Sequence, residues 1–84
     1  MSFYVYIIYS KRLDKYYVGY TEDILVRLTQ HNTGISTFTS KATDWELKYK
    51  EEFIDRNDAY KRESEIKRKK SRKYIEWLIC NYNK

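Results

Sequence analysis

Five polar side chains of this sequence could do chemistry, although they are far apart along the chain. Arg27 and His31, the only histidine, stand four residues apart, so a helix would place them on one side. Tyr6 and Tyr17 belong to two short aromatic segments, and a tyrosine can pack its ring while still offering a hydroxyl. Glu63 falls within an apolar helical pattern, where a carboxylate is costly unless it is paired or binds a cation. Position alone therefore nominates a polar site built from tyrosines, an arginine, a histidine and one carboxylate.

A hairpin is expected to carry the two tyrosines. Phe3 to Tyr9, FYVYIIY, is aromatic or β-branched throughout, which is typical of a strand covered on both faces. After a polar loop, YYVGY at residues 16–20 predicts a second, antiparallel strand. A regular register in which paired numbers sum to 23 would place Tyr6 opposite Tyr17. Gly19 is expected as a bulge or tight exit of that strand, as room for a phosphate, or as both.

A helix is expected to position the arginine and the histidine. Thr21 is a suitable N-cap, and Gly34 can end the helix. At 100° per residue, Arg27 and His31 fall on the flank of the apolar stripe and are expected at the edge of the core. The stripe that meets the sheet is expected to consist of Ile24, Leu25 and Leu28.

The second half of the chain predicts one more strand and two helices. Residues 45–53, WELKYKEEF, alternate between apolar and polar positions, which indicates a strand with one wetted side whose apolar face is Trp45, Leu47, Tyr49 and Phe53. Asp55 or Asn57 can cap a helix from about Asp58 to Lys70. One face of this helix is expected to contain Ala59, Glu63, Ile66 and Lys70.

Ser71 interrupts the helical register and can cap a last helix, from Arg72 to about Tyr82. The predicted order is therefore β-β-α-β-α-α, a single α+β domain over residues 1–84 in which a small three-stranded antiparallel sheet is flanked by about three helices. In a chain this short, any site must share residues with the one available core.

The charge distribution favours a polyanionic partner. Seventeen Lys and Arg against twelve Asp and Glu give a net charge of +5. Much of the excess lies in one run, KRESEIKRKKSRK, which is either a phosphate-binding surface or a solvated helix. Its basic residues are Lys61, Arg62, Lys67, Arg68, Lys69, Lys70, Arg72 and Lys73. The lone Cys80 excludes an internal disulfide, and with no long apolar run the sequence favours a cytoplasmic location and no membrane partner.

The motifs, taken in order, resemble those of the GIY-YIG nucleases and especially their small stand-alone bacterial branch. YVY at residues 4–6 stands where the family has GIY, and YVG at residues 17–19 stands where it has YIG. RLTQHN at residues 27–32 fits the helix motif that follows, and AYKRESEIK contains Glu63 at the family's glutamate. KSRKYIEWLI is similar to the ending of the branch. One departure is the family's first glycine, which is Tyr4 here. A second concerns an asparagine that some members place near the site from the C-terminal part, and whether Asn81 or Asn83 takes that place stays open at this stage.

The resemblance implies a role for each candidate. Glu63 would anchor one Mg²⁺ or Mn²⁺, since such a cation can be held by one carboxylate when substrate phosphate completes its shell. Arg27 would contact the scissile phosphate with its fork of donors. Tyr17 is the preferred general base and Tyr6 would hold the water or a phosphate oxygen, while His31 is the rival base or a proton relay. Without the family, Glu63 could equally form an i,i+4 pair with a lysine, worth about 0.2–0.5 kcal/mol.

The implied function is a metal-dependent endonuclease that cuts DNA phosphodiesters, in DNA repair or processing, and leaves 5′ phosphates and 3′ hydroxyls. The basic run and Gly19 would contact the nucleic acid, mainly through phosphates. A partner protein or a DNA shape would direct it, since no separate binding domain is visible. One alternative is a non-catalytic nucleic-acid-binding module on the same fold, and another is a basic protein-interaction adaptor. DNA versus RNA and the oligomeric state stay open at this stage.

Overall fold

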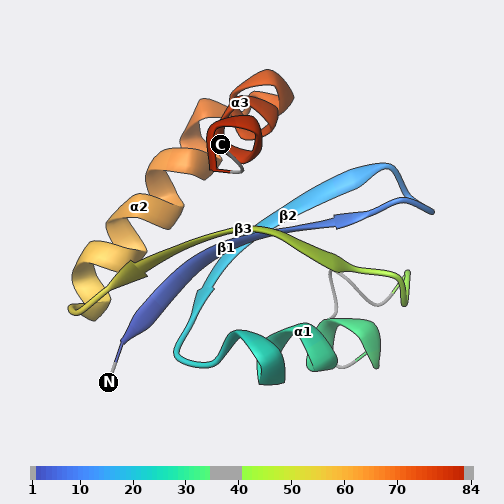
Figure 1. Cartoon of the computed structure of the whole chain (residues 1–84), viewed down its shortest axis with the longest axis horizontal. Helices are drawn as coiled ribbons and strands as arrows, with labels where there is room; N and C mark the ends of the chain where they lie inside the picture. Colours follow the sequence, from blue (N-terminus) through green and yellow to red (C-terminus); the bar gives the residue numbers. More distant parts are fainter. Residues whose placement is uncertain (1, 35–40, 83–84) are drawn as a thin grey trace.

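The computed structural model describes residues 2–34 and 41–82, and it has the predicted order of elements. Figure 1 shows α1 on one side of the sheet and α2 and α3 on the other. No helix in these two ranges is long and apolar enough to cross a membrane. The elements are β1 (Phe3–Ser10), β2 (Lys15–Thr21), α1 (Ile24–Asn32), β3 (Glu46–Phe53), α2 (Arg56–Lys69) and α3 (Arg72–Tyr82).

The hairpin of β1 and β2 has a different register from the one predicted. The strands are antiparallel, as expected, but Tyr6 pairs with Gly19 and Ile8 pairs with Tyr17. The predicted pairing of Tyr6 with Tyr17 is therefore wrong by two residues. The cause is the turn: Ser10 pairs with Lys15, which leaves a four-residue connection whose last residue adopts a positive φ of 52°. Because the shift is an even number, both tyrosines still face the same side of the sheet.

A register shift between β1 and β3 overturns the prediction of a single apolar face on β3. β1 is the central strand of the order β2-β1-β3, and β3 pairs with it in antiparallel fashion. Ile7 pairs with Tyr49 and Ile8 with Leu47, so the residue between them on β3 is an extra one. Beyond this bulge the alternation reverses. Trp45 consequently packs in the cluster on the α1 side, whereas Tyr49 packs in the cluster on the other side.

The first helix begins two residues later than predicted, and it uses a different stripe. Asp23, not Thr21, is the N-cap, and its carboxylate accepts a hydrogen bond from the backbone of Val26 at 3.2 Å. Leu25, predicted to meet the sheet, is 77% exposed. His31 was predicted at the edge of the core but is fully buried. The stripe that meets the sheet therefore has i, i+4, i+7 spacing, and its members are Ile24, Leu28 and His31.

The later helices are close to their predictions. Asp55 caps α2 by accepting a hydrogen bond from the backbone of Asn57 at 2.8 Å. The backbone N–H of Tyr74 donates to Ser71 Oγ at 3.2 Å, so Ser71 supports the start of α3, whose bounds agree with the sequence. Between the two helices Lys70 adopts a left-handed conformation with φ of 47°. The basic run therefore does not lie along one continuous helix.

Candidate active site

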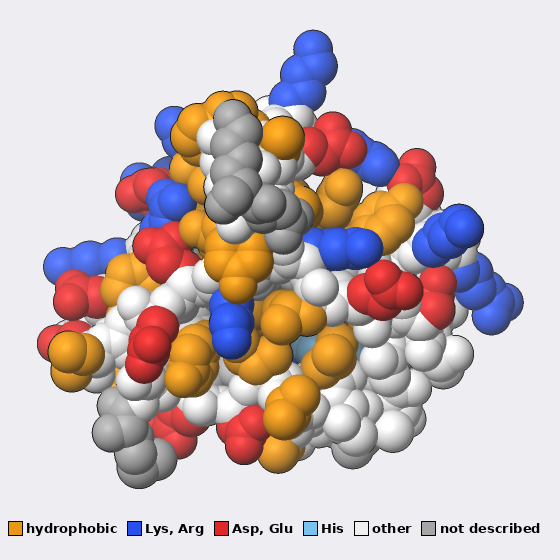
Figure 2. Space-filling view, in the orientation of Figure 1, with side chains coloured by type: hydrophobic (Ala, Val, Ile, Leu, Met, Phe, Trp, Pro, Cys, Tyr) orange, Lys and Arg blue, Asp and Glu red, His pale blue; other side chains and the backbone are white. Residues whose placement is uncertain are grey.

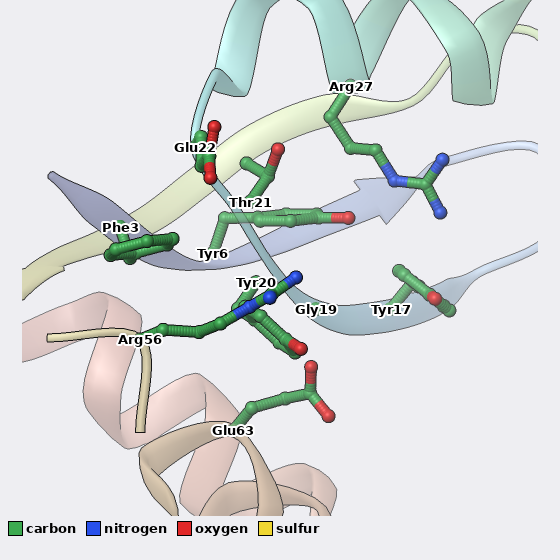
Figure 3. Close-up of a pocket in the computed structure, with 10 residues that line it drawn as sticks. All are labelled: Phe3, Tyr6, Tyr17, Gly19, Tyr20, Thr21, Glu22, Arg27, Arg56 and Glu63. Carbon is green, nitrogen blue, oxygen red and sulfur yellow. The ribbon is translucent and has the colours of Figure 1, made fainter. Parts of the chain in front are cut away.

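A cleft of about 490 Å³ opens at the edge strand β2 and gathers four of the five candidate residues. Figure 3 shows Arg27 reaching toward β2 from α1 and Glu63 reaching toward it from α2, on the opposite side of the strand. An edge strand is the one place where side chains from both faces of a sheet can meet. The lining residues are Phe3, Tyr6, Tyr17, Gly19, Tyr20, Thr21, Glu22, Arg27, Arg56 and Glu63.

Gly19 makes room for the ring of Tyr6. A Cβ atom on Gly19 would stand 2.6 Å from Tyr6 Oη and 2.8 Å from Tyr6 Cζ, and 3.2 Å from Tyr17 Cε2. The strand is regular here, with no bulge between β1 and β2, and Gly19 has no positive φ. Of the expectations for this glycine, neither the bulge nor the tight exit is found, since β2 continues to Thr21. The space that a side chain would fill is occupied by the phenol of Tyr6.

Tyr6 and His31 form a buried hydrogen-bonded pair beneath the cleft. Tyr6 Oη lies 2.8 Å from His31 Nε2. Burial raises the pKa of Tyr6 to about 12, so its hydroxyl stays protonated at neutral pH. Burial, and then the nearby charge of Arg27, lower the pKa of His31 to about 4, so its imidazole stays neutral. The pair is therefore a protonated phenol bonded to a neutral imidazole, and the tautomer of His31 sets which of the two donates.

Tyr17 is the tyrosine placed between this pair and the cleft mouth. Its ring centroid lies 5.0 Å from that of His31, with the rings edge to face, and 6.4 Å from that of Tyr6. Its side chain is partly exposed, whereas Tyr6 is only 2% exposed. Of the two tyrosines, Tyr17 is therefore the one that solvent or a substrate can reach directly. His31 lies behind both rings and has no direct access to the cleft.

Two guanidinium groups face the cleft, those of Arg27 and Arg56. Only Arg27 was predicted from the sequence. Arg27 is partly buried and donates from Nη1 to Gln30 Oε1 at 3.0 Å, which holds its side chain along the helix. Arg56, at the start of α2, extends over Tyr20 into the same cleft in Figure 3. Its spacing of seven residues from Glu63 puts both on one side of α2, and this signal was present in the sequence. The pair offers two anion-binding forks above one carboxylate.

Glu63 is the single carboxylate on the α2 side of the cleft. Its side chain is 12% exposed and Oε1 lies 3.3 Å from Lys67 Nζ, the i,i+4 partner weighed from the sequence. No group of three or more metal-ligating side chains occurs within residues 2–34 and 41–82. Mg²⁺ does not need one, because it keeps several waters and is commonly held by one or two carboxylates together with substrate phosphates. Glu63, in a cleft that can also admit a substrate phosphate, therefore fits such a cation, whereas the described residues form no all-protein cage.

The predicted nucleic-acid-binding residues are divided among several faces. Arg62 points inward to Glu51, at 3.2 Å, and Arg72 binds Asp14 at 2.6 Å on the hairpin. Lys69 lies over the ring of Tyr74, 5.4 Å from its centroid. Figure 2 shows the Lys and Arg side chains of the α2 edge interspersed with acidic ones. The remaining members, for which the described part of the chain shows no ion pair, are Lys61, Arg68, Lys70 and Lys73.

Of the two C-terminal asparagines, Asn81 is not among the residues that line the cleft. Asn81 donates from its amide to the backbone carbonyl of Trp77 at 2.8 Å and is exposed. Asn83 lies outside the described residues. The departure noted in the sequence is thus not compensated by Asn81.

Comparison with known proteins gives one family match and one similar solved structure. Residues 2–75 match the GIY-YIG catalytic domain, a range that includes all five candidate residues. The solution NMR structure of the UPF0213 protein BH0048 from Bacillus halodurans is similar, with 31% sequence identity and a TM-score of 0.60. That similarity covers 95% of this chain and 84% of the other. No curated protein matches the chain at a significant level.

Proposed function

The chain belongs to the GIY-YIG family, and we propose that it is a metal-dependent endonuclease that hydrolyses phosphodiester bonds of nucleic acid, with DNA as the expected substrate. The observation that carries the proposal is the meeting of Arg27, Tyr17 and Glu63 in one cleft although they come from three elements. A phosphodiester requires charge neutralisation, an activated water and stabilisation of the leaving oxygen. The cleft offers a group for each requirement.

Arg27 is proposed to bind the non-bridging oxygens of the scissile phosphate, with Arg56 binding the same or the next phosphate. A planar fork matches phosphate geometry in a way that a lysine does not. Both groups lie on the rim of the cleft that Glu63 and Tyr17 line. Glu63 would hold one Mg²⁺ or Mn²⁺, which when bound supplies positive charge next to the phosphate and the leaving oxygen.

Tyr17 is proposed to orient the attacking water and to accept its proton as a phenolate, whose formation the bound cation or Arg27 would assist. Tyr6 is proposed to hold the water or a phosphate oxygen through its hydroxyl. The raised pKa of Tyr6, about 12, makes it a poor base at neutral pH. His31 is buried behind Tyr6 and is held neutral, so a direct role as base is disfavoured by its position. Its part is to hold the hydroxyl of Tyr6 in place through the hydrogen bond between Tyr6 Oη and His31 Nε2.

The experiment is a cleavage assay with matched glutamate variants. Purified protein is incubated with supercoiled plasmid, branched DNA and RNA, in Mg²⁺, Mn²⁺ or EDTA. Glu63→Gln and Tyr17→Phe are each expected to lower the cleavage rate by about a hundredfold or more. Glu65→Gln is the control, because Glu65 lies on the same helix but faces away from the cleft and pairs with Arg62.

Cleavage that persists in EDTA or in Glu63→Gln would contradict the proposal. Nucleic-acid binding without cleavage in either metal would favour the alternative of a non-catalytic binding module on this fold. Relative rates on the three substrates also decide between DNA and RNA, and indicate whether repair or processing of DNA is the setting in which the enzyme acts.

A further inference from the structure

A second cleft lies beside the candidate active cleft, and one tyrosine forms a wall of both. Its volume is about 610 Å³, and it lies between β2, the end of α2 and the start of α3. Tyr17 lines both clefts. Its size is within the range of about 300–1,000 Å³ that is usual for ligand sites. A nucleic-acid strand whose phosphate reaches Arg27 and Glu63 therefore has this cleft as its immediate neighbour.

The second cleft has an apolar floor and a cationic rim. Val18 and Ile66 are buried core residues at its base, and Ile75 packs against the same cluster. Asp14 is the one acidic residue among those that line it, and it is already paired with a rim arginine. Charge and polarity together complement a planar ring that carries a phosphate. The basic lining residues are Lys15, Lys67, Lys70 and Arg72.

One side of α2 connects the two clefts. Residues 56, 60, 63 and 67 are separated by steps of four, three and four, so they follow one another along the helix surface, and Lys70 directly follows the end of the helix. Arg56 and Glu63 line the active cleft, whereas Lys67 and Lys70 line the second. Fourteen residues of helix rise by about 21 Å, which is long enough to follow several nucleotides of a strand. At the boundary, Lys67 Nζ lies 5.5 Å from the ring centroid of Tyr17.

We propose that the second cleft binds the nucleotide next to the scissile phosphate with its base unpaired, an inference that rests on the proposed nuclease function. Lys67 and Lys70 contact the phosphate of this nucleotide, and its base lies against Ile75, the partly exposed member of the floor, above the buried Val18 and Ile66. In a continuous duplex the faces of a base are covered by its neighbours, so only an unstacked base can present a face to such a floor. The substrate class is therefore nucleic acid with an unpaired nucleotide beside the cut, in preference to continuous duplex.

Adjacent lysines provide a matched test that does not depend on cleavage. Lys70 lines the second cleft, whereas Lys69 lines neither cleft and lies over Tyr74. Binding of a labelled thymidine octanucleotide and of a fully paired hairpin duplex is measured by fluorescence anisotropy in EDTA. Lys70→Gln is expected to weaken single-strand binding about threefold to tenfold more than Lys69→Gln, with equal effects of the two on duplex. Equal single-strand losses would overturn the proposal.

The opposite rim gives an independent pair of variants, in case the left-handed Lys70 position affects folding. Lys15→Gln is expected to weaken single-strand binding more than Lys11→Gln, since Lys11 is exposed in the hairpin turn and lines neither cleft. The same loss in both variants would contradict a nucleotide in this cleft.

Methyl NMR tests whether a base, and not only a phosphate, enters the cleft. The dinucleotide pdTpdT, added in EDTA, is expected to shift the methyl signals of Val18, Ile66 and Ile75, whereas inorganic phosphate is expected to leave them in place. Unchanged methyl signals with pdTpdT, or equal shifts with phosphate alone, would overturn base binding. If no metal supports cleavage, the proposed function is contradicted, but the binding and NMR measurements can still be interpreted because they are made in EDTA. If the binding and NMR results are negative, only the nucleotide site is contradicted and the nuclease proposal is unaffected.

Discussion

The two faces of the sheet share the central strand β1 but have different contents. On the α2 and α3 side, β1 contributes Val5 and Ile7 to an apolar cluster that is closed by both helices. On the α1 side, β1 contributes Tyr6 and Ile8 to a smaller cluster, and a fully buried histidine lies among them. A short chain has a single sheet with which both to stabilise the fold and to build a site. The difference shows that one face supplies most of the apolar burial while the other carries polar groups that burial alone would not favour.

The largest loss of stability is expected from a substitution on the apolar face. Ile66 is 1% exposed, so Ile66→Ala leaves a cavity among packed side chains and should lower the free energy of unfolding by about 2–5 kcal/mol. Ile54, which is 88% exposed, is the matched control, and Ile54→Ala should change it by less than about 0.5 kcal/mol. Urea unfolding followed by circular dichroism measures both. Equal losses in the two variants would show that Ile66 is not part of a close-packed core.

The polar face should show the opposite balance, with a large change in activity and a small one in stability. Arg27→Ala is expected to lower the cleavage rate about a hundredfold to a thousandfold, because it removes a donor to the phosphate in the transition state. The affinity for DNA should stay within severalfold, since Arg27 serves one phosphate among many. Arg68→Ala is the control, as Arg68 is exposed on α2 and lines neither cleft. If affinity falls together with activity, Arg27 is a binding anchor instead.

The sequence predicted the element order and the caps of the later helices well because those depend on local signals. Asp55 and Ser71 are side chains that cap the residues directly after them, and the structure confirms both. The N-cap of α1 was placed two residues early, at Thr21 in place of Asp23. The larger errors arose where distant segments decide. The hairpin register depends on a four-residue turn, and the faces of β3 depend on a bulge that only pairing with β1 reveals. Periodicity cannot show either feature, since it counts along one segment at a time.

The sequence predicted most residues of the candidate site but not how they are arranged in space. Arg27 and Glu63 were expected near the sheet. They meet across β2 because β2 is an edge strand in the order β2-β1-β3, and this order was not predicted from the sequence. His31 was expected at the edge of the core but is buried. The reason is that α1 packs its Ile24 and Leu28 side against the sheet, and His31 belongs to the same side of the helix. Arg56 was missed although it shares a helix side with Glu63. Arg56 lies outside the basic run of residues 61–73, so charge clustering does not point to it.

A third prediction uses pH to separate the two faces. The pKa of His31 is lowered to about 4 in the folded protein, against about 6.5 in an unfolded chain. Between these values the unfolded state takes up a proton that the folded state does not. The resulting stability is therefore complete above about pH 6.5 and is lost as the pH falls toward 4, in total about 3 kcal/mol. The His31→Phe variant should lack this pH-dependent contribution to the free energy of unfolding.

The measurement is urea unfolding of both proteins at several values between pH 4 and pH 7.5. Acidic side chains contribute equally to the two curves, so their difference isolates the imidazole. If the curves are parallel over the whole interval, His31 titrates normally in the folded protein and the polar pair under the cleft is not as buried as the structure has it.

The smallest expected effects on stability come from alanine substitutions of the two glycines. Gly19 is needed for space beside Tyr6, whereas Gly34 is needed for its positive φ. Gly19→Ala places a Cβ atom 2.6 Å from Tyr6 Oη, so the phenol must move, and its bond to His31 lengthens or breaks. We expect a loss of about 1–3 kcal/mol from overpacking, with a marked fall in cleavage. Gly34→Ala meets no atom within 4 Å but has a φ of 81°, so about 1–2 kcal/mol of backbone strain is expected with no change in cleavage. Similar unfolding free energies with divergent cleavage rates would show that Gly19 acts through Tyr6, whereas unchanged cleavage in Gly19→Ala would mean that the position of the Tyr6 hydroxyl does not matter to the chemistry.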